Sequence, residues 1–108
     1  MASVQEWNAE MFVQSTASGV AVVDFYAVWC GPCKMMMSVL TEAVSEFSDE
    51  ELKVGKINIE NCRDLAAEFN VRTIPTFIVF KNGEVVSRHI GVQSRNMLVN
   101  AVRKALEA

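Results

Sequence analysis

Residues 20–37 read VAVVDFYAVWCGPCKMMM, a β-branched and aromatic run that leads directly into a Cys-x-x-Cys sequence. The run Val20–Tyr26 is apolar except for Asp24, a pattern that favours a strand covered on both faces of a sheet. After Cys33 the apolar residues change to a helical spacing and fall on one helix face. These residues are Met36, Leu40, Ala43, Val44 and Phe47. The stretch therefore predicts a buried strand that ends at two cysteines, where a helix begins.

Further strands are expected on both sides of this stretch. Leu52–Ile59 resembles a second buried strand, so the first strand, the helix and this strand form a βαβ unit with parallel strands. Val4–Trp7 is compatible with a short edge strand. Asn82-Gly83 is a strong hairpin signal, because both residues accept the left-handed backbone that a tight turn requires. The hairpin would join antiparallel strands at Thr76–Phe80 and Glu84–Ile90.

Capping residues mark three more helices. A side-chain oxygen at a helix start accepts a backbone N–H that has no partner within the helix. The residues expected in this role are Asn8, Asn61 with Asp64, and Ser94. Gly19 ends the first of these helices or follows it after a short loop, and Asn70 marks the end of the second. The buried stripe of the last helix is expected at Met97, Leu98, Ala101, Val102 and Ala105.

Length and charge narrow the class of protein. At 108 residues, 51% hydrophobic and 21% charged, the chain fits one folded domain, residues 1–108. A net charge of -3 without a basic cluster argues against nucleic-acid binding. No apolar run approaches the roughly 20 residues that a membrane span needs. The N-terminal residues lack Lys and Arg and carry Glu6 and Glu10, unlike a signal peptide. We expect a soluble, cytoplasmic monomer.

The position of Cys30 and Cys33 points to redox chemistry. The first amides of a helix have no acceptor within the helix, and the helix dipole favours negative charge there. A Cys30 thiolate would therefore be stabilised and nucleophilic. Three residues of separation in a helical turn bring the two sulfurs together, and Gly31 and Pro32 permit the tight start. Cys30 would attack a substrate disulfide, and Cys33 would resolve the mixed disulfide.

Other uses of the pair remain open at this point. The two cysteines could form a static disulfide or remain as buried thiols. A zinc site needs four ligands, and only Cys62 and His89 could complete one, at a spacing that matches no common zinc pattern. A haem attachment needs His directly after the second cysteine, where Lys34 stands. Cys62 itself is either an incidental free cysteine or a regulatory thiol.

The motif Trp29-Cys30-Gly31-Pro32-Cys33-Lys34 resembles the active-site signature of the thioredoxin family. Other family segments recur in order, namely Val23-Asp24-Phe25, Lys56-Ile57-Asn58, Ile74-Pro75-Thr76, Phe80-Lys81-Asn82-Gly83-Glu84 and Gly91. The resemblance implies an α/β thioredoxin fold, with a central mixed five-stranded β-sheet flanked by four α-helices. It also implies a protein-disulfide reductase without a bound cofactor or metal. The partners would be disulfide-containing proteins and a thioredoxin reductase that draws on NADPH.

The resemblance also assigns roles to residues outside the cysteine pair. Asp24 would exchange a proton with Cys33, and the neighbouring Lys56 would tune the charge of Asp24. Pro75 would follow a cis peptide bond and lie against the cysteines, and the backbone of Ile74 would pair with an extended substrate segment. Gly91 would leave room for that segment. The substrate surface would further include Trp29, Gly31, Pro32 and Thr73.

Three residues depart from the family pattern. Ser38 stands where many members have a proline within the helix, so the helix should lose a kink or keep it through packing and hydroxyl bonding. Tyr26 replaces a frequent tryptophan, and Val28 replaces a residue that is often charged. A different class of function is a binding subunit that uses the fold as a surface and not its thiols. Serine at both cysteines would separate the two, since binding would survive the change.

Overall fold

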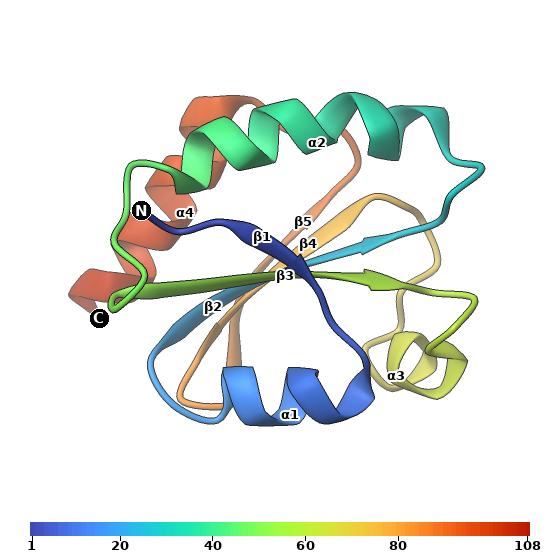
Figure 1. Ribbon diagram of the computed structural model, residues 1–108, viewed down its shortest axis with the longest axis horizontal. Coiled ribbons are helices and arrows are strands. Elements are labelled where there is room, and N and C mark those ends of the chain that lie inside the picture. Colours follow the sequence, from blue (N-terminus) through green and yellow to red (C-terminus); the bar gives the residue numbers. More distant parts are fainter.

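The computed structural model describes residues 1–108 and contains five strands and four helices (Figure 1). Their order confirms the alternation expected from the sequence. In chain order they are β1 Val4–Glu6, α1 Ala9–Thr16, β2 Val20–Tyr26, α2 Gly31–Val44, β3 Leu52–Asn58, α3 Arg63–Glu68, β4 Thr76–Lys81, β5 Glu84–Ile90 and α4 Arg95–Glu107.

The strands form one mixed sheet in the order β1-β3-β2-β4-β5. β1, β3 and β2 are parallel to one another, whereas β4 and β5 run antiparallel to their neighbours. Figure 1 shows α2 and α4 on one face of the sheet and α1 and α3 on the other. The structure thus confirms the expected α/β fold, a mixed five-stranded sheet flanked by four helices.

The central strand β2 supplies both cores because its side chains alternate between the two faces. Val20 and Val22 belong to the larger core, beneath α2 and α4. Ala21, Val23 and Phe25 belong to the smaller core, toward α1 and α3. Coverage on both faces explains the continuous apolar run, and it places the one charged residue of the strand inside the protein.

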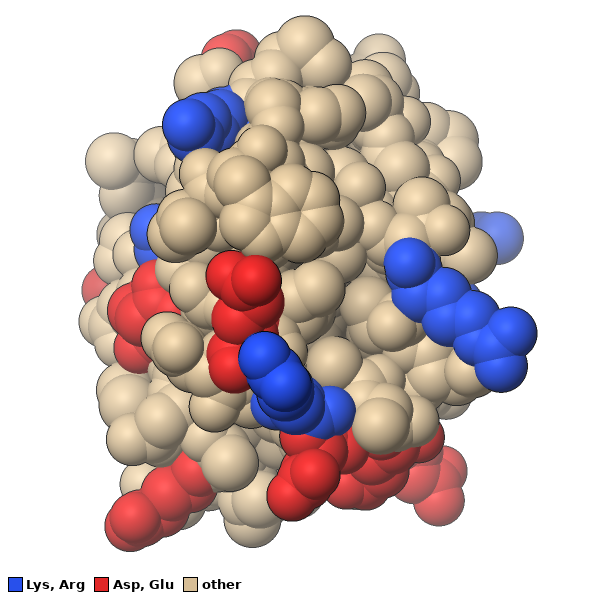
Figure 2. Space-filling model, turned by 90° about the vertical axis from the view of Figure 1, so that its right-hand side faces the viewer, with Lys and Arg blue, Asp and Glu red and all other residues tan.

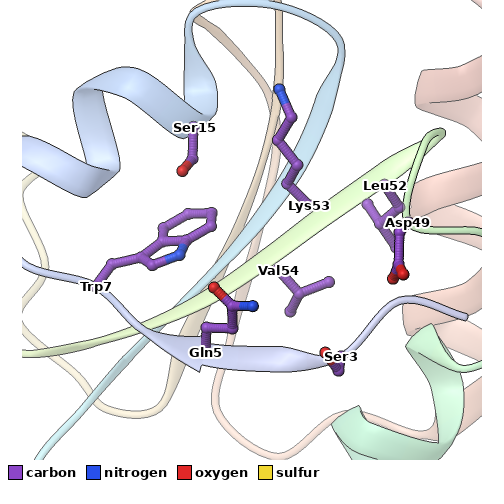
Figure 3. Close-up of a pocket in the computed structure, with 8 residues that line it drawn as sticks. All are labelled: Ser3, Gln5, Trp7, Ser15, Asp49, Leu52, Lys53 and Val54. Carbon is purple, nitrogen blue, oxygen red and sulfur yellow. The ribbon is translucent and has the colours of Figure 1, made fainter.

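A tight contact between Trp7 and β3 helps to hold the N-terminal segment. The Trp7 indole lies over β3 at Gly55, where an added Cβ would come within 1.9 Å of the ring. Figure 3 shows Trp7 between β3 and α1, beside a groove that Gln5, Lys53 and other residues line. Only a residue without a side chain fits beneath the ring, and the contact adds to the ladder that pairs β1 with β3 at the sheet edge.

Most predicted helix and turn signals are confirmed. Asn8 and Ser94 cap α1 and α4, each accepting a backbone N–H, at 2.8 Å and 3.1 Å respectively. Asn70 ends the α3 segment with a positive φ of 55°. Asn82 and Gly83, with φ of 51° and 84°, form the hairpin turn. Local side-chain chemistry was therefore a reliable guide at these positions.

Three sequence expectations are wrong in detail. Cys62, and not Asn61, occupies the cap position of α3, and no side chain bonds to the free amides there. Phe47 lies in the same core as the face of α2 but beyond the end of that helix. Met97 is 50% exposed because it flanks the buried stripe of α4, whose centre is formed by Leu98 and Val102.

No helix of the structure has the length and apolarity that crossing a membrane requires.

Candidate active site

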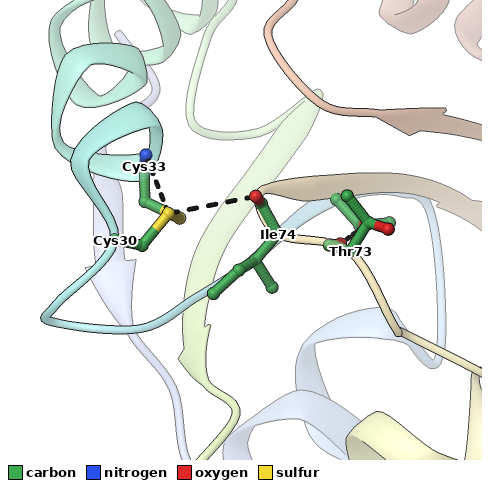
Figure 4. Close-up of a disulfide and its surroundings, with 5 residues drawn as sticks. Cys30, Cys33, Thr73 and Ile74 are labelled. Carbon is green, nitrogen blue, oxygen red and sulfur yellow. Dashed lines mark hydrogen bonds between the residues drawn. A yellow bond between two sulfur atoms is a disulfide. The ribbon is translucent and has the colours of Figure 1, made fainter.

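The cysteine pair lies at the start of α2, where the polypeptide leaves the central strand. Cys30 is the N-cap residue, and its sulfur accepts the backbone N–H of Cys33 at 3.1 Å. The two residues form a disulfide, with their Cα atoms 5.2 Å apart (Figure 4). The expected geometry is therefore present, with two side chains that face each other within one turn.

This position favours the ionised form of Cys30 when the disulfide is opened. The Cys33 amide already points at the Cys30 sulfur, and the N-terminal end of a 14-residue helix carries partial positive charge. Both effects stabilise a thiolate, so that a larger fraction of the opened Cys30 is ionised and ready to attack, and the thiolate leaves more readily in the reverse exchange. The arrangement is suited to reversible exchange of disulfides. Across the chain, no three His, Cys, Asp or Glu side chains gather as a metal site requires.

The two sulfurs face different surroundings. Cys33 lines a pocket of about 210 Å³ together with Asp24, Met37 and Lys56, whereas Cys30 is not part of its wall. The Cys30 sulfur instead lies 3.9 Å from the carbonyl oxygen of Ile74 (Figure 4). Both cysteines are largely covered, with Cys30 5% and Cys33 2% exposed. Cys30 thus faces the Ile74 side of the site, and Cys33 faces the interior.

The Ile74–Pro75 segment forms the second wall of the site. Its peptide bond is cis, and the carbonyl of Pro75 accepts the N–H of Gly91 at 2.8 Å. Gly91 has a φ of 84°, a conformation that side chains disfavour, and an added Cβ would meet no atom within 4 Å. Thr73 is exposed beside Ile74. The structure therefore brings Thr73, Ile74 and Pro75 to the cysteines. The hydrogen bond to Pro75 holds Gly91 next to this segment.

Asp24 is fully buried on the face of the sheet that α2 covers. Neither of its carboxyl oxygens has a hydrogen-bond partner. Burial raises the pKa of Asp24 from 3.8 to about 7, the Lys56 ammonium opposes this shift, and Glu6 adds to it. A carboxyl group that titrates near neutral pH can exchange protons under physiological conditions. It lies in the wall of the pocket that also contains Cys33.

Lys56 is the direct neighbour of Asp24 across the β2–β3 ladder. Its ammonium nevertheless pairs with another carboxylate, Glu6 of β1, at 3.8 Å from Oε1. The Tyr26 hydroxyl donates to the same oxygen of Glu6 at 2.6 Å. Sequence reasoning missed Glu6. Residues two positions apart in a strand point to the same face, so Glu6 shares with Val4 the face of the sheet that α2 covers.

Apolar side chains surround the mouth of the site. Trp29 is 64% exposed, and Val28 and Met35 are also largely exposed. The Trp29 indole donates to Glu60 at 3.1 Å, a second contact that sequence reasoning missed. Figure 2 shows the end of the molecule where α2 begins, with a broad uncharged area and acidic groups gathered along its lower edge. This face can accept an apolar polypeptide segment.

Three other residues singled out from the sequence have plain structural surroundings. Ser38 lies within an uninterrupted α2, and its hydroxyl donates to the Met35 carbonyl at 3.4 Å, the hydroxyl bonding considered for this position. Cys62 is partly exposed and has no disulfide partner. His89 is paired with the Ser87 hydroxyl at 2.9 Å on β5, and burial lowers its pKa.

Comparisons with known proteins agree with this geometry. The family model described as Thioredoxin matches residues 2–104. The chain is 40% identical to a thioredoxin of Bacillus subtilis over 97 residues, covering 90% of this chain and 92% of that protein. It is 41% identical to a thioredoxin of Staphylococcus saprophyticus, with coverages of 88% and 90%. A solved mutant thioredoxin from Halobacterium salinarum superposes with a TM-score of 0.83 at 30% identity, covering 99% of this chain and 92% of that chain.

Proposed function

This chain belongs to the thioredoxin family, and we propose that Cys30, Cys33 and Asp24 carry its reaction as nucleophile, resolving thiol and proton acceptor. Membership makes the protein a disulfide oxidoreductase that reduces protein disulfides by thiol–disulfide exchange. Its redox group is its own disulfide, so it works without a bound cofactor. The observation that carries the proposal is the Cys30 sulfur at the helix start, which is bonded to the Cys33 sulfur and accepts the backbone N–H of Cys33.

The reaction consists of two exchanges. In the first, the Cys30 thiolate attacks one substrate sulfur, forming a mixed disulfide while the other substrate sulfur leaves as a thiolate. In the second, Asp24 takes the proton of Cys33, and the new thiolate attacks the Cys30 sulfur. The Cys30–Cys33 bond closes, and the remaining substrate sulfur leaves as a thiolate that takes a proton from water. The substrate gains two electrons, and the protein loses two.

The walls of the site suggest how a substrate is held. An extended segment around the substrate disulfide would pair with the Ile74 backbone beside Cys30, as in strand addition. Gly91 presents no side chain on that path. Trp29 and Thr73, together with the turn at Gly31 and Pro32, would contact the residues on either side of the disulfide. Lys56 would act on the reaction through Asp24 and not by touching the substrate.

Partners and location follow from the family and not from a contact in the structure. We propose that a thioredoxin reductase using NADPH restores the dithiol, and that the chain acts in the cytoplasm as a single-domain monomer. In a reducing compartment a Cys-x-x-Cys pair serves chemistry more often than stability. The competing role, a binding subunit that uses the surface alone, would not require either cysteine.

An insulin reduction assay tests this function, with dithiothreitol and with a reductase–NADPH system as electron donors. The wild type should turn over. Cys30→Ser should not, and Cys33→Ser should accumulate a mixed disulfide, because the second exchange lacks its thiol. Cys62→Ser is the matched control, since Cys62 has no disulfide partner, and it should retain activity. Absence of turnover with both donors, or binding of natural partners by the double serine variant without any reduction in cells, would favour the binding role.

A further inference from the structure

Three charged residues form a row across the parallel part of the sheet. Lys56 of β3 pairs in register with Asp24 of β2 on one side and with Glu6 of β1 on the other. Register partners in parallel strands point to the same face, so all three side chains lie on the face that α2 covers. One ammonium therefore stands between two carboxyl groups, of which Asp24 is buried and Glu6 is half exposed.

The ammonium is on the side of the exposed carboxylate. Lys56 Nζ lies 3.8 Å from Oε1 of Glu6 and forms no ion pair with Asp24. The two carboxyl oxygens of Asp24 have no hydrogen-bond partner. Tyr26 fixes this arrangement from two directions. Its hydroxyl donates to Glu6 at 2.6 Å, and its ring centroid lies 5.2 Å from the ammonium. A charged acceptor and an aromatic face together hold the cation away from the buried carboxyl group.

We propose that Glu6 is a positioning residue for the redox reaction, which, held by Tyr26, draws the Lys56 ammonium away from Asp24 and so favours protonated Asp24. The proposal rests on the proposed function, in which Asp24 exchanges its proton with Cys33. It assigns to the sheet edge a role in the proton transfer, although Glu6 touches neither cysteine nor substrate. Tyr26, which departs from the family pattern, supplies the hydroxyl that this arrangement requires.

The electrostatic contributions of Glu6 act in one direction. Its own negative charge disfavours a second carboxylate nearby, and its hold on Lys56 keeps at a greater distance the cation that would stabilise one. Burial is the largest cause of the raised Asp24 pKa, and Lys56 opposes it. The other titratable groups around the pocket carry no negative charge that could replace Glu6 in the oxidised protein. They are Tyr26 of β2, whose own pKa is raised to about 12 by burial and the Glu6 contact, and Cys33 and Lys34 of α2.

Glu6→Gln separates charge from shape. The amide oxygen still accepts from Tyr26, but the negative charge is gone, so the ammonium is free to approach Asp24. An opposite charge at about 4–6 Å lowers a carboxyl pKa by about 1 or more pH units. We therefore expect the midpoint of the Asp24 titration to move down by about 1 pH unit in this variant.

The experiment follows the Asp24 carboxyl carbon by NMR across pH in the oxidised full-length chain. Glu84→Gln is the control, since it removes one negative charge at the far end of β2, at the β4–β5 hairpin. Glu6→Gln should lower the midpoint and the control should not. In a Lys56→Gln background, the shift of the Asp24 midpoint caused by Glu6→Gln should fall to less than half of the shift seen with Lys56 present. An unmoved midpoint, an equal effect of Glu84→Gln, or an undiminished effect without the ammonium would overturn the proposal.

The pH profile of insulin reduction provides the second readout. The acidic limb of the Glu6→Gln profile should move in the same direction as the NMR midpoint, which a loss of folding or of substrate binding would not produce. The carboxyl titration needs no substrate. Failure of the proposed function would therefore appear as absent turnover in the wild type, whereas failure of this inference would appear as an unchanged titration.

Discussion

Replacing Asp24 by asparagine should abolish much of the pH dependence of the protein's stability, so that the variant gains stability relative to the wild type as pH rises toward neutral. The pKa of Asp24 is 3.8 when solvated and about 7 in the fold. Between these values the folded protein binds a proton that the unfolded chain has released. Its free energy of unfolding therefore falls as pH rises from about 4 to about 7, and it levels off above that range.

The size of the effect follows from the shift. At about 1.4 kcal/mol per pH unit, the interval from 3.8 to about 7 corresponds to about 4 kcal/mol. No discount for solvent screening applies, because Asp24 is fully buried. An asparagine leaves a buried polar group without partners at every pH. The resulting loss of stability shifts the whole plot of unfolding free energy against pH but does not change its slope.

Urea unfolding of the oxidised protein from pH 4 to pH 8 measures this directly. The difference in unfolding free energy between Asp24→Asn and the wild type should grow in favour of the variant by about 4 kcal/mol over that range. Asp49→Asn, in an exposed loop, is the matched control and should run parallel to the wild type. If the Asp24→Asn curve also ran parallel, the buried carboxyl group would not carry the raised pKa, and its proposed role as proton acceptor near pH 7 would lose its basis.

Three further changes have defined outcomes. Gly55→Ala should lower the urea-derived unfolding free energy by about 1–3 kcal/mol, since its Cβ would overlap the Trp7 ring, whereas Gly31→Ala, with open space at its Cβ, should not. Ser94→Ala removes the cap of α4 and should cost about 1 kcal/mol in the same assay, and an unchanged midpoint would contradict that role. Val28→Glu adds charge to the apolar rim. It should raise about 2- to 5-fold the ratio of kcat/KM for disulfide peptides flanked by Lys to kcat/KM for peptides flanked by Leu. An unaltered ratio would show that the rim does not select substrates.

The sequence predicted those features that depend on neighbours along the chain. The apolar run before Cys30 and the helical spacing after Cys33 place the pair at a strand-to-helix turn, and the caps at Asn8 and Ser94 depend on residues three positions away. Such signals are local, and the structure confirms them. Met97 was misplaced because helical spacing alone does not say how wide the buried stripe is.

The features that escaped prediction depend on pairing between distant strands. Lys56 could be assigned to Asp24 by resemblance, but its ion pair with Glu6 depends on the register of β1 against β3. A three-residue strand contains too little alternation to fix that register from sequence. The bond from Trp29 to Glu60 likewise joins two loops 31 positions apart. Periodicity assigns Glu6 to a face of the sheet, but it does not identify the partner of either side chain.

The edge strand β1 has a consequence for the acidity at which the protein works. It is three residues long and pairs with β3 only. The cysteine turn and the surface around it come from other segments. On the role proposed for Glu6, a substitution in this border strand changes the acidity at which the reaction runs and leaves unaltered the surface that substrates contact.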